Sequence, residues 1–172
     1  MSIPLSTIKS ALKIDYADDD TTLLLYREAA EELVERETGL YMTPLVRQMF
    51  LARFEDTAIP LLPFTSVTKV EYQDANNVNV LMPAADYWID RSNGPAPILK
   101  FLETPTIYEG TNITVSVDCG YNAIPNALVH CIIALVGGWY NNPEAFQPVG
   151  LNAVPMSVDY ILSSYRARSF IR

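Results

Sequence analysis

Very few residues of this chain have the types and spacing that catalysis or metal binding requires. His130 is the only histidine among 172 residues, and the two cysteines are Cys119 and Cys131. His130 and Cys131 are neighbours in an apolar stretch typical of a helix, and adjacent helical residues point to different faces. This spacing disfavours a Cys–His pair, so we expect His130 to be a packed or interface residue. We expect Cys131 to act as a small hydrophobic residue, because two cysteines do not make a disulfide framework.

Acidic residues are the second candidate for chemistry. Asp18, Asp19 and Asp20 precede an amphipathic helical stretch, where carboxylates cap free N–H groups and face the positive end of the helix dipole. A calcium loop would add a glycine turn and a distant glutamate, which do not follow here. Glu31 and Glu35 are one helical turn apart on the polar face, which predicts a solvated surface and not a general acid–base pair.

The sequence also lacks the short motifs that mark common active sites. It contains no GxxxxGK[ST], GxGxxG, HExxH, GxSxG or CxxC pattern. We therefore expect no catalytic residues, no cofactor and no bound metal. The residues alone favour a structural or interaction protein over an enzyme.

Composition and charge restrict the class of protein further. The chain is 49% hydrophobic and 19% charged, which is typical of a globular protein. Its net charge of -8 is the opposite of a nucleic-acid-binding surface. The first ten residues, MSIPLSTIKS, lack a basic region followed by an apolar run, so we expect no secretory signal. The longest uncharged apolar run, 131–140, is too short to span a membrane, so we expect a soluble protein made in the cytoplasm.

The stretch 113–140 organises the elements that would position these residues. Alternating apolar residues predict a strand over 113–117, and Gly120 and Asn122 end it. Pro125 suits the first position of a following helix. Apolar residues then recur at steps of three and four, and they include Leu128, Ile132, Leu135 and Trp139. A helix this apolar must be covered on several sides, by the rest of the chain or by another subunit.

The remaining elements follow from periodicity and turn chemistry. We predict a short helix over 5–12 with Ser6 as its N-cap, and a long helix that runs to Thr38 and stops at Gly39. Short strands follow from 46 to 117, and the turn residues 74–77 predict a β-hairpin over 67–82. A last short helix starts near 156.

These elements together predict an α+β fold that is mainly a helical bundle. We expect about four helices, with a small antiparallel β insertion between the second and third. The chain is predicted to form one domain, 1–172, with a helical part at 1–40 and 120–172 and the β-rich insertion at about 41–119.

Four segments in this order resemble the head–tail connector proteins of tailed phages, also called adaptor or head-completion proteins. The first is LSTIKSALKIDYADDDTTLLLYREAAEELVERETG, a short helix, an acidic turn and a long helix. The others are PLLPFTSVTKVEYQDANN, VSVDCGYNAIPNALVHCIIALVGGWYNNPEAF and VDYILSSYR. Phe64-Thr65 stands where the family usually has a second proline, and Asn142-Pro143 replaces its arginine-containing turn.

The resemblance implies a non-enzymatic structural protein of the virion, located at the head–tail junction. Family members assemble as a ring of about twelve copies beneath the portal protein. Such a ring extends the DNA channel, lets DNA pass without specific binding, and offers a docking surface for a stopper or tail-completion protein. A membrane is not among the implied partners.

Two sets of residues are candidates for interaction sites under this hypothesis. The basic C-terminal tail supplies candidate portal contacts, because arginine and aromatic residues are enriched at interfaces; these are Tyr165, Arg166, Arg168, Phe170 and Arg172. The apolar helix supplies candidate core or inter-subunit contacts: Leu128, Ile132, Leu135 and Trp139.

Two alternative functions remain open at this point. The first is a tail-completion or tail-terminator protein of the same particle, which would share the ring habit. The second is a small ligand-binding domain with a pocket formed by polar groups such as Tyr121, Asp118 and His130.

Overall fold

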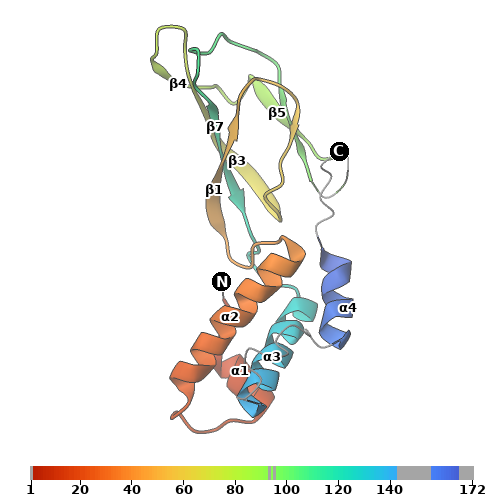
Figure 1. Ribbon diagram of the computed structural model, residues 1–172. Helices are drawn as coiled ribbons and strands as arrows, with labels where there is room; N and C mark the ends of the chain where they lie inside the picture. The colour runs from red at the N-terminus through yellow and green to blue at the C-terminus, as the bar shows by residue number, and fades with distance from the viewer. Residues whose placement is uncertain (1, 93, 95, 143–155, 167–172) are drawn as a thin grey trace. The chain divides into compact units, whose positions relative to one another are not determined.

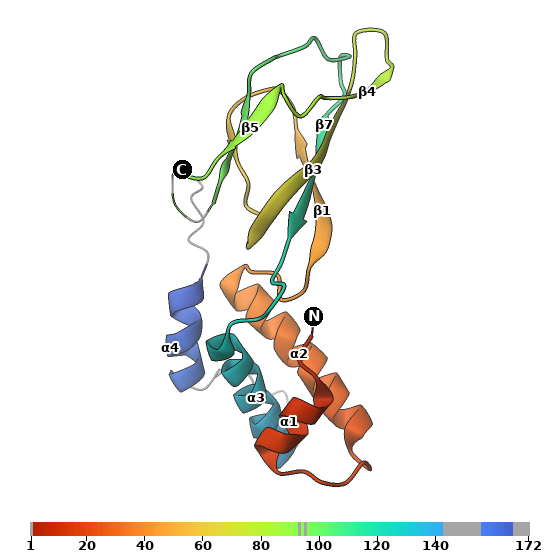
Figure 2. The same ribbon diagram turned by 180° about the vertical axis from the view of Figure 1, so that it is seen from behind.

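The computed structural model describes residues 2–92, 94, 96–142 and 156–166, and its elements are shown in Figure 1 and, from behind, in Figure 2. The chain divides into two compact units. A helical unit contains the described residues of 1–43 and 122–167, and a β unit contains those of 44–121. The prediction that 1–172 behaves as one domain stays a prediction.

The helical unit is built around the apolar helix α3 (Asn126–Asn141). α3 contacts α1 (Leu5–Leu12), α2 (Asp20–Thr38) and α4 (Met156–Tyr165), as both ribbon views show. The core of the unit is formed by buried side chains from all four helices, among them Ile8, Leu23, Val34, Leu128, Ile132 and Leu162. The other three helices of the same chain therefore bury much of the apolar surface of α3.

The ends of the helices only partly follow the sequence pattern. Gly39 ends α2 in the left-handed conformation at φ 72°, and its N–H donates to the Glu35 carbonyl, as predicted. The side-chain cap predicted at Ser6 is wrong, whereas the aspartates do lie at the start of α2, with Asp20 in its first turn. Pro4 precedes α1, and the Asp19 carboxylate, at the N-cap of α2, makes no capping bond. The hydroxyl of Tyr140 donates to this carboxylate instead.

The β unit consists of two antiparallel sheets. The four-stranded sheet has the order β1-β7-β3-β4, and the three-stranded sheet has the order β2-β6-β5. The strands are β1 (Leu45–Leu51), β2 (Thr57–Ala58), β3 (Phe64–Gln73), β4 (Asn79–Leu81), β5 (Tyr87–Asp90), β6 (Ile98–Phe101) and β7 (Ile113–Cys119). One hydrophobic cluster joins both sheets; its buried members are Leu51, Ile59, Val70, Met82, Leu99, Ile113, Val115 and Val117.

The pairing register determines which side chains of the four-stranded sheet face this core. Val115 of β7 lies between Met49 of β1 and Val70 of β3, and all three contribute to the hydrophobic cluster. Because successive residues of a strand alternate between faces, the neighbouring row points away from the core. That row, on the outer face, contains Phe50, Thr114, Glu71 and Leu81, one from each strand.

The hairpin predicted from turn residues is confirmed. β3 and β4 pair antiparallel, and the Asp74 carboxylate accepts the backbone N–H groups of Asn76 at 2.9 Å and Val78 at 3.0 Å. Asn77 adopts the left-handed conformation at φ 62°, which asparagine tolerates better than most residues. Local side-chain chemistry thus fixes this turn.

The prediction of a mainly helical bundle is wrong. The described chain has four helices, but it also has seven strands in two sheets with a hydrophobic core of their own, so the fold is α+β in two units. The strands were predicted as a small insertion because prolines keep many of them short. Their layering depends on partners far apart in sequence, such as Leu45 opposite Cys119. Strand length alone does not reveal such pairing.

Candidate interaction surfaces

The residues predicted on the apolar helix lie mostly inside the protomer. Leu128, Ile132 and Leu135 are at most 3% exposed and form part of the core of the helical unit. Trp139 is half-buried, and its ring packs edge-to-face against Tyr26 with ring centroids 6.2 Å apart. An inter-subunit role for these four residues stays a prediction.

The residues predicted to bind the portal are described only in part. Tyr165 is half-buried at the end of α4, and Arg166 is exposed. The Arg166 guanidinium lies 2.9 Å from Asp159 and 3.3 Å from Glu37, which connects the end of α4 to α2. These ion pairs are exposed, so each stabilises the fold by at most about 1 kcal/mol. Arg168, Phe170 and Arg172 lie outside the described residues.

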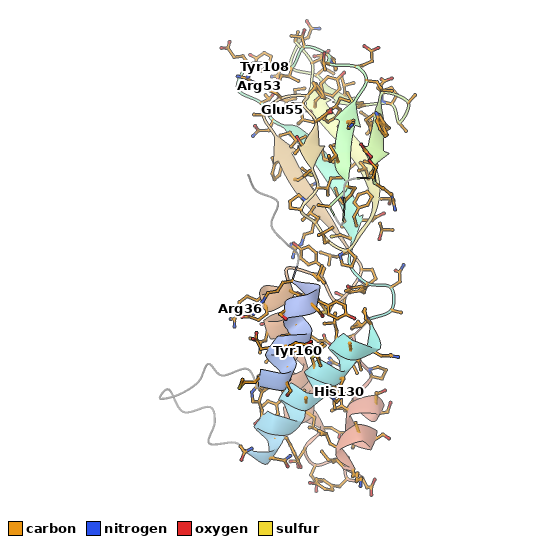
Figure 3. All side chains as sticks on the ribbon, turned by 90° about the vertical axis from the view of Figure 1, so that its right-hand side faces the viewer. Arg36, Arg53, Glu55, Tyr108, His130 and Tyr160 are labelled. Atoms are coloured by element: carbon orange, nitrogen blue, oxygen red, sulfur yellow. The ribbon has the colours of Figure 1, made fainter. Side chains whose placement is uncertain are left out.

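Two exposed apolar side chains on α4 escaped the sequence analysis. Met156 is 91% exposed and Tyr160 is 80% exposed. They are four residues apart and therefore share one helical face. Figure 3 shows Tyr160 projecting from α4, with His130 on α3. The sequence did contain a signal for them. Val158 and Leu162 mark the buried face of α4, and Met156 and Tyr160 are large side chains that do not belong to that face.

The reactive side chains do not converge. His130 is exposed, whereas its neighbour Cys131 is fully buried. Cys119 is buried in the β unit, where its thiol faces the Leu45 carbonyl at 3.7 Å. Burial raises the pKa of both thiols. Neither cysteine therefore has the electropositive, exposed surroundings that activate a thiol.

A hydrogen-bonded cluster connects the α1–α2 loop to the end of α3. The Tyr140 hydroxyl donates to the Asp19 carboxylate at 2.6 Å, and the Tyr16 hydroxyl lies 2.6 Å from that of Tyr140. Nearby, the Lys9 ammonium pairs with Asp20 at 2.6 Å and donates to the Tyr16 carbonyl. The bonds to Asp19 and Tyr16 raise the pKa of the Tyr140 phenol well above its ordinary value. These hydrogen bonds keep the phenol of Tyr140 protonated, which suits a structural contact.

The outer face of the four-stranded sheet contains a hollow of about 450 Å³. Glu71, Leu81 and Thr114 of the outer row line it, together with Gln73, Asn79 and Thr111. Phe50, 63% exposed, neighbours Thr114 in the same row, and Leu81 is 61% exposed. The Glu71 carboxylate is paired with the Lys69 ammonium at 2.8 Å. The hollow therefore combines one exposed apolar side chain, Leu81, with one carboxylate that is paired within the protomer, and Phe50 lies outside its lining.

The outer face of the three-stranded sheet carries an exposed tryptophan. Tyr87 and Ile89 pack on the core, so Trp88 between them points outward and is 46% exposed. The Lys100 ammonium lies 5.1 Å from the centre of the Trp88 ring and 3.1 Å from Asp90. Hydrogen bonds from Ser92 and Lys100 lower the pKa of Asp90 to about 2, so this carboxylate stays charged.

The described residues form neither a metal-binding cluster nor a helix that could span a membrane. There, no group of three or more His, Cys, Asp or Glu side chains is placed to hold a metal ion. Among the helices of the described segments, none is both long and apolar enough to cross a membrane.

Comparison with known proteins finds similarity in structure but not in sequence. No protein-family model matches the chain, and no curated protein sequence matches it. Among solved structures, chains of gene transfer agent (GTA) particles superpose on 96% of this chain. One comes from the virion of the native particle, with a TM-score of 0.76, 20% identity and 89% of that chain covered.

Two further matches come from structures of the particle neck. A chain from the neck of the empty particle, computed with C6 symmetry, has a TM-score of 0.74, 21% identity and 89% of its length covered. A chain from the neck of the native particle, computed with C12 symmetry, has a TM-score of 0.73, 20% identity and 88% covered. This chain shares their fold. Because the match spans both the helical and the β unit, the shared fold includes both units.

Proposed function

We propose that this protein is a structural, non-enzymatic component of the head–tail junction of a phage-like particle. The observation that carries the proposal is the fold shared over 96% of the chain with chains from particle-neck structures. The ordered connector-like segments of the sequence support the same function independently. In this proposal the protein is an adaptor beneath the portal that offers a docking surface to a stopper or tail-completion protein.

A ring is the assembly that suits this position. The neck structures with similar chains were computed with C6 and C12 symmetry, which supports a ring with twelve copies. The net charge of -8 supports a role as a DNA channel, because an acidic wall repels the phosphate backbone and lets DNA slide. DNA would then pass through the ring without specific binding.

The C-terminal segment is the proposed portal contact. Tyr165 and Arg166 stand at the end of α4, and the sequence continues with Arg168, Phe170 and Arg172. Arg166 already pairs with Asp159 and Glu37 on the surface of its own helical unit. Since such exposed pairs are weak, a portal carboxylate can replace them at little cost.

The experiment that tests the proposal is native mass spectrometry of the protein alone and mixed with its portal protein. We expect rings, formed alone or on the portal, and loss of portal binding when residues 166–172 are removed. A matched control replaces Arg166, Arg168 and Arg172 with lysine, which preserves the charge but not the planar guanidinium. A protein that stays monomeric with its portal would contradict the proposal, and binding to tail-tube protein instead would indicate a tail-terminator.

A further inference from the structure

The proposed ring imposes a condition on the surface of each copy, and the inference below rests on that proposed function. In a closed ring of identical subunits, each copy meets its two neighbours through two different patches. These patches must be complementary in shape and charge, and every copy must carry both.

The β unit has two sheet faces that its own core leaves uncovered. The hydrophobic cluster lies between the two sheets, so their other faces point in opposite directions. β4 borders the hollow and β5 carries Trp88, and both strands lie toward the same end of the β unit in Figures 1 and 2. A patch on each face can therefore lie at the same level when copies stand side by side.

The first patch is concave. Its hollow of about 450 Å³ falls within the roughly 300–1,000 Å³ of pockets that hold organic ligands, so it has room for an indole ring. Leu81, which is 61% exposed, and Val80 supply its apolar lining. Glu71 contributes a carboxylate that has one partner, Lys69, within the protomer.

The second patch is centred on Trp88. Trp88 projects from the middle of β5, and Lys100, opposite it in the pairing register, places its ammonium over the ring. An ammonium has three N–H donors, so Lys100 can hold Asp90 and a second carboxylate at once. Tryptophan is the residue most typical of interface hot spots, and it needs a well-packed pocket on the partner to act as one.

We propose that the two patches bind each other between adjacent copies of this chain. Trp88 of one copy enters the hollow beside Leu81 and Val80 of the next, and Lys100 pairs with Glu71 across the contact. Leu81 and Val80 cover part of the indole, and the lysine beside Trp88 matches the carboxylate of the hollow. Since each patch is on every copy, the contact repeats around the ring.

The test measures ring formation by sedimentation velocity over a concentration series, alone and with portal protein. Trp88→Ala should weaken each contact about 30-fold or more, the effect of losing a hot-spot residue. Leu25→Ala is the control, because it removes an exposed apolar side chain from α2, outside both patches, and should leave assembly unchanged. Circular dichroism and thermal unfolding verify that both variants fold.

A double-mutant cycle tests the ion pair. Glu71→Gln and Lys100→Gln should each weaken assembly about fivefold, and the double variant should be no weaker than either single one. If the two residues acted independently, their free-energy effects would add, and the fold-changes in affinity would multiply in the double variant. Glu55→Gln on the β1–β2 loop controls for the loss of one carboxylate.

The outcomes separate this inference from the function on which it rests. If wild-type rings form and Trp88→Ala assembles equally well, the inference is overturned while the connector proposal stands. Additive effects of Glu71→Gln and Lys100→Gln would overturn the proposed pairing. If the wild-type protein forms no ring alone or with its portal, the connector proposal fails and the inference fails with it.

Discussion

The phenol of Tyr140 links its ionisation to the folding of the helical unit. It donates to the Asp19 carboxylate, and the Tyr16 hydroxyl approaches it from the other side. Deprotonation would place a phenolate beside that carboxylate, so the pKa of Tyr140 lies above its ordinary value of 10.0 in the folded protein. The unfolded chain has no such contact and therefore loses this proton first.

This linkage predicts how the Tyr140→Phe variant responds to pH. The variant should have a lower free energy of unfolding at neutral pH because it lacks both hydrogen bonds. In the wild-type protein, the contribution of Tyr140 to the free energy of unfolding is fully present below pH about 10. It is lost as the pH rises through the pKa of Tyr140 in the folded protein. The difference between the two proteins should therefore shrink above pH about 10 in urea unfolding experiments.

A second tyrosine substitution controls for general alkaline effects. Tyr160→Phe removes a hydroxyl from a side chain that is 80% exposed, and its stability should follow the wild-type curve. If wild type and Tyr140→Phe lose stability in parallel at alkaline pH, the phenol is not linked to folding.

At the scale of the element, α3 contains two adjacent glycines in different surroundings. A Cβ added to Gly137 would lie 2.8 Å from the Leu12 side chain of α1, whereas a Cβ added to Gly138 would meet nothing within 4 Å. Gly137 therefore permits close packing of α1 on α3, and Gly138 only adds conformational freedom to the unfolded chain.

Alanine substitutions at these two positions should separate packing from helix propensity. Gly138→Ala should raise the free energy of unfolding by about 0.5–1 kcal/mol. Gly137→Ala gains the same propensity, but Leu12 must move, and overpacking costs about 1–3 kcal/mol. Because the clash is with the end of a flexible side chain, we expect Gly137→Ala to be less stable than Gly138→Ala by about 1 kcal/mol in chemical denaturation; equal effects would show that Leu12 adjusts freely.

The elements also show where sequence patterns suffice and where they do not. Gly39 and Asp74 act on backbone groups a few residues away, so the end of α2 and the β3–β4 turn were predictable. Asp19 was predicted to cap α2, but it bonds Tyr140, which is 121 residues away. Which of Phe50, Trp88 and their strand neighbours point away from the core depends on how the strands pair in each sheet. The sequence of a single strand does not define that pairing. Long-range partners therefore account for most of the errors.

At the scale of the whole molecule, the helical unit contains the segments on both sides of the β unit. α2 precedes residues 44–121 and α3 follows them. If the β unit unfolded alone, these residues would become a flexible loop whose closure opposes the folded helical unit by about 4 kcal/mol. That cost is comparable with the stability of a small domain, so we propose that the two units unfold together.

Leucine truncations, one in each core, test this single-domain prediction. Leu128 lies in the helical core and Leu99 in the β core, and both are fully buried. Leu128→Ala and Leu99→Ala should each lower the free energy of unfolding by about 2–5 kcal/mol. Both should shift one shared thermal transition, as measured by calorimetry. Two transitions, each responding only to the substitution in its own core, would divide the chain into separate domains.

The two buried thiols have a practical consequence for studying assembly. Cys119 and Cys131 are inaccessible, and burial keeps both thiols protonated at neutral pH. Maleimide dyes should therefore ignore the native cysteines and label only one introduced on the surface, for example by Ser163→Cys on α4. Fluorescence transfer between dyes on neighbouring copies would then report subunit spacing during assembly, with no native residue replaced beyond the labelled one.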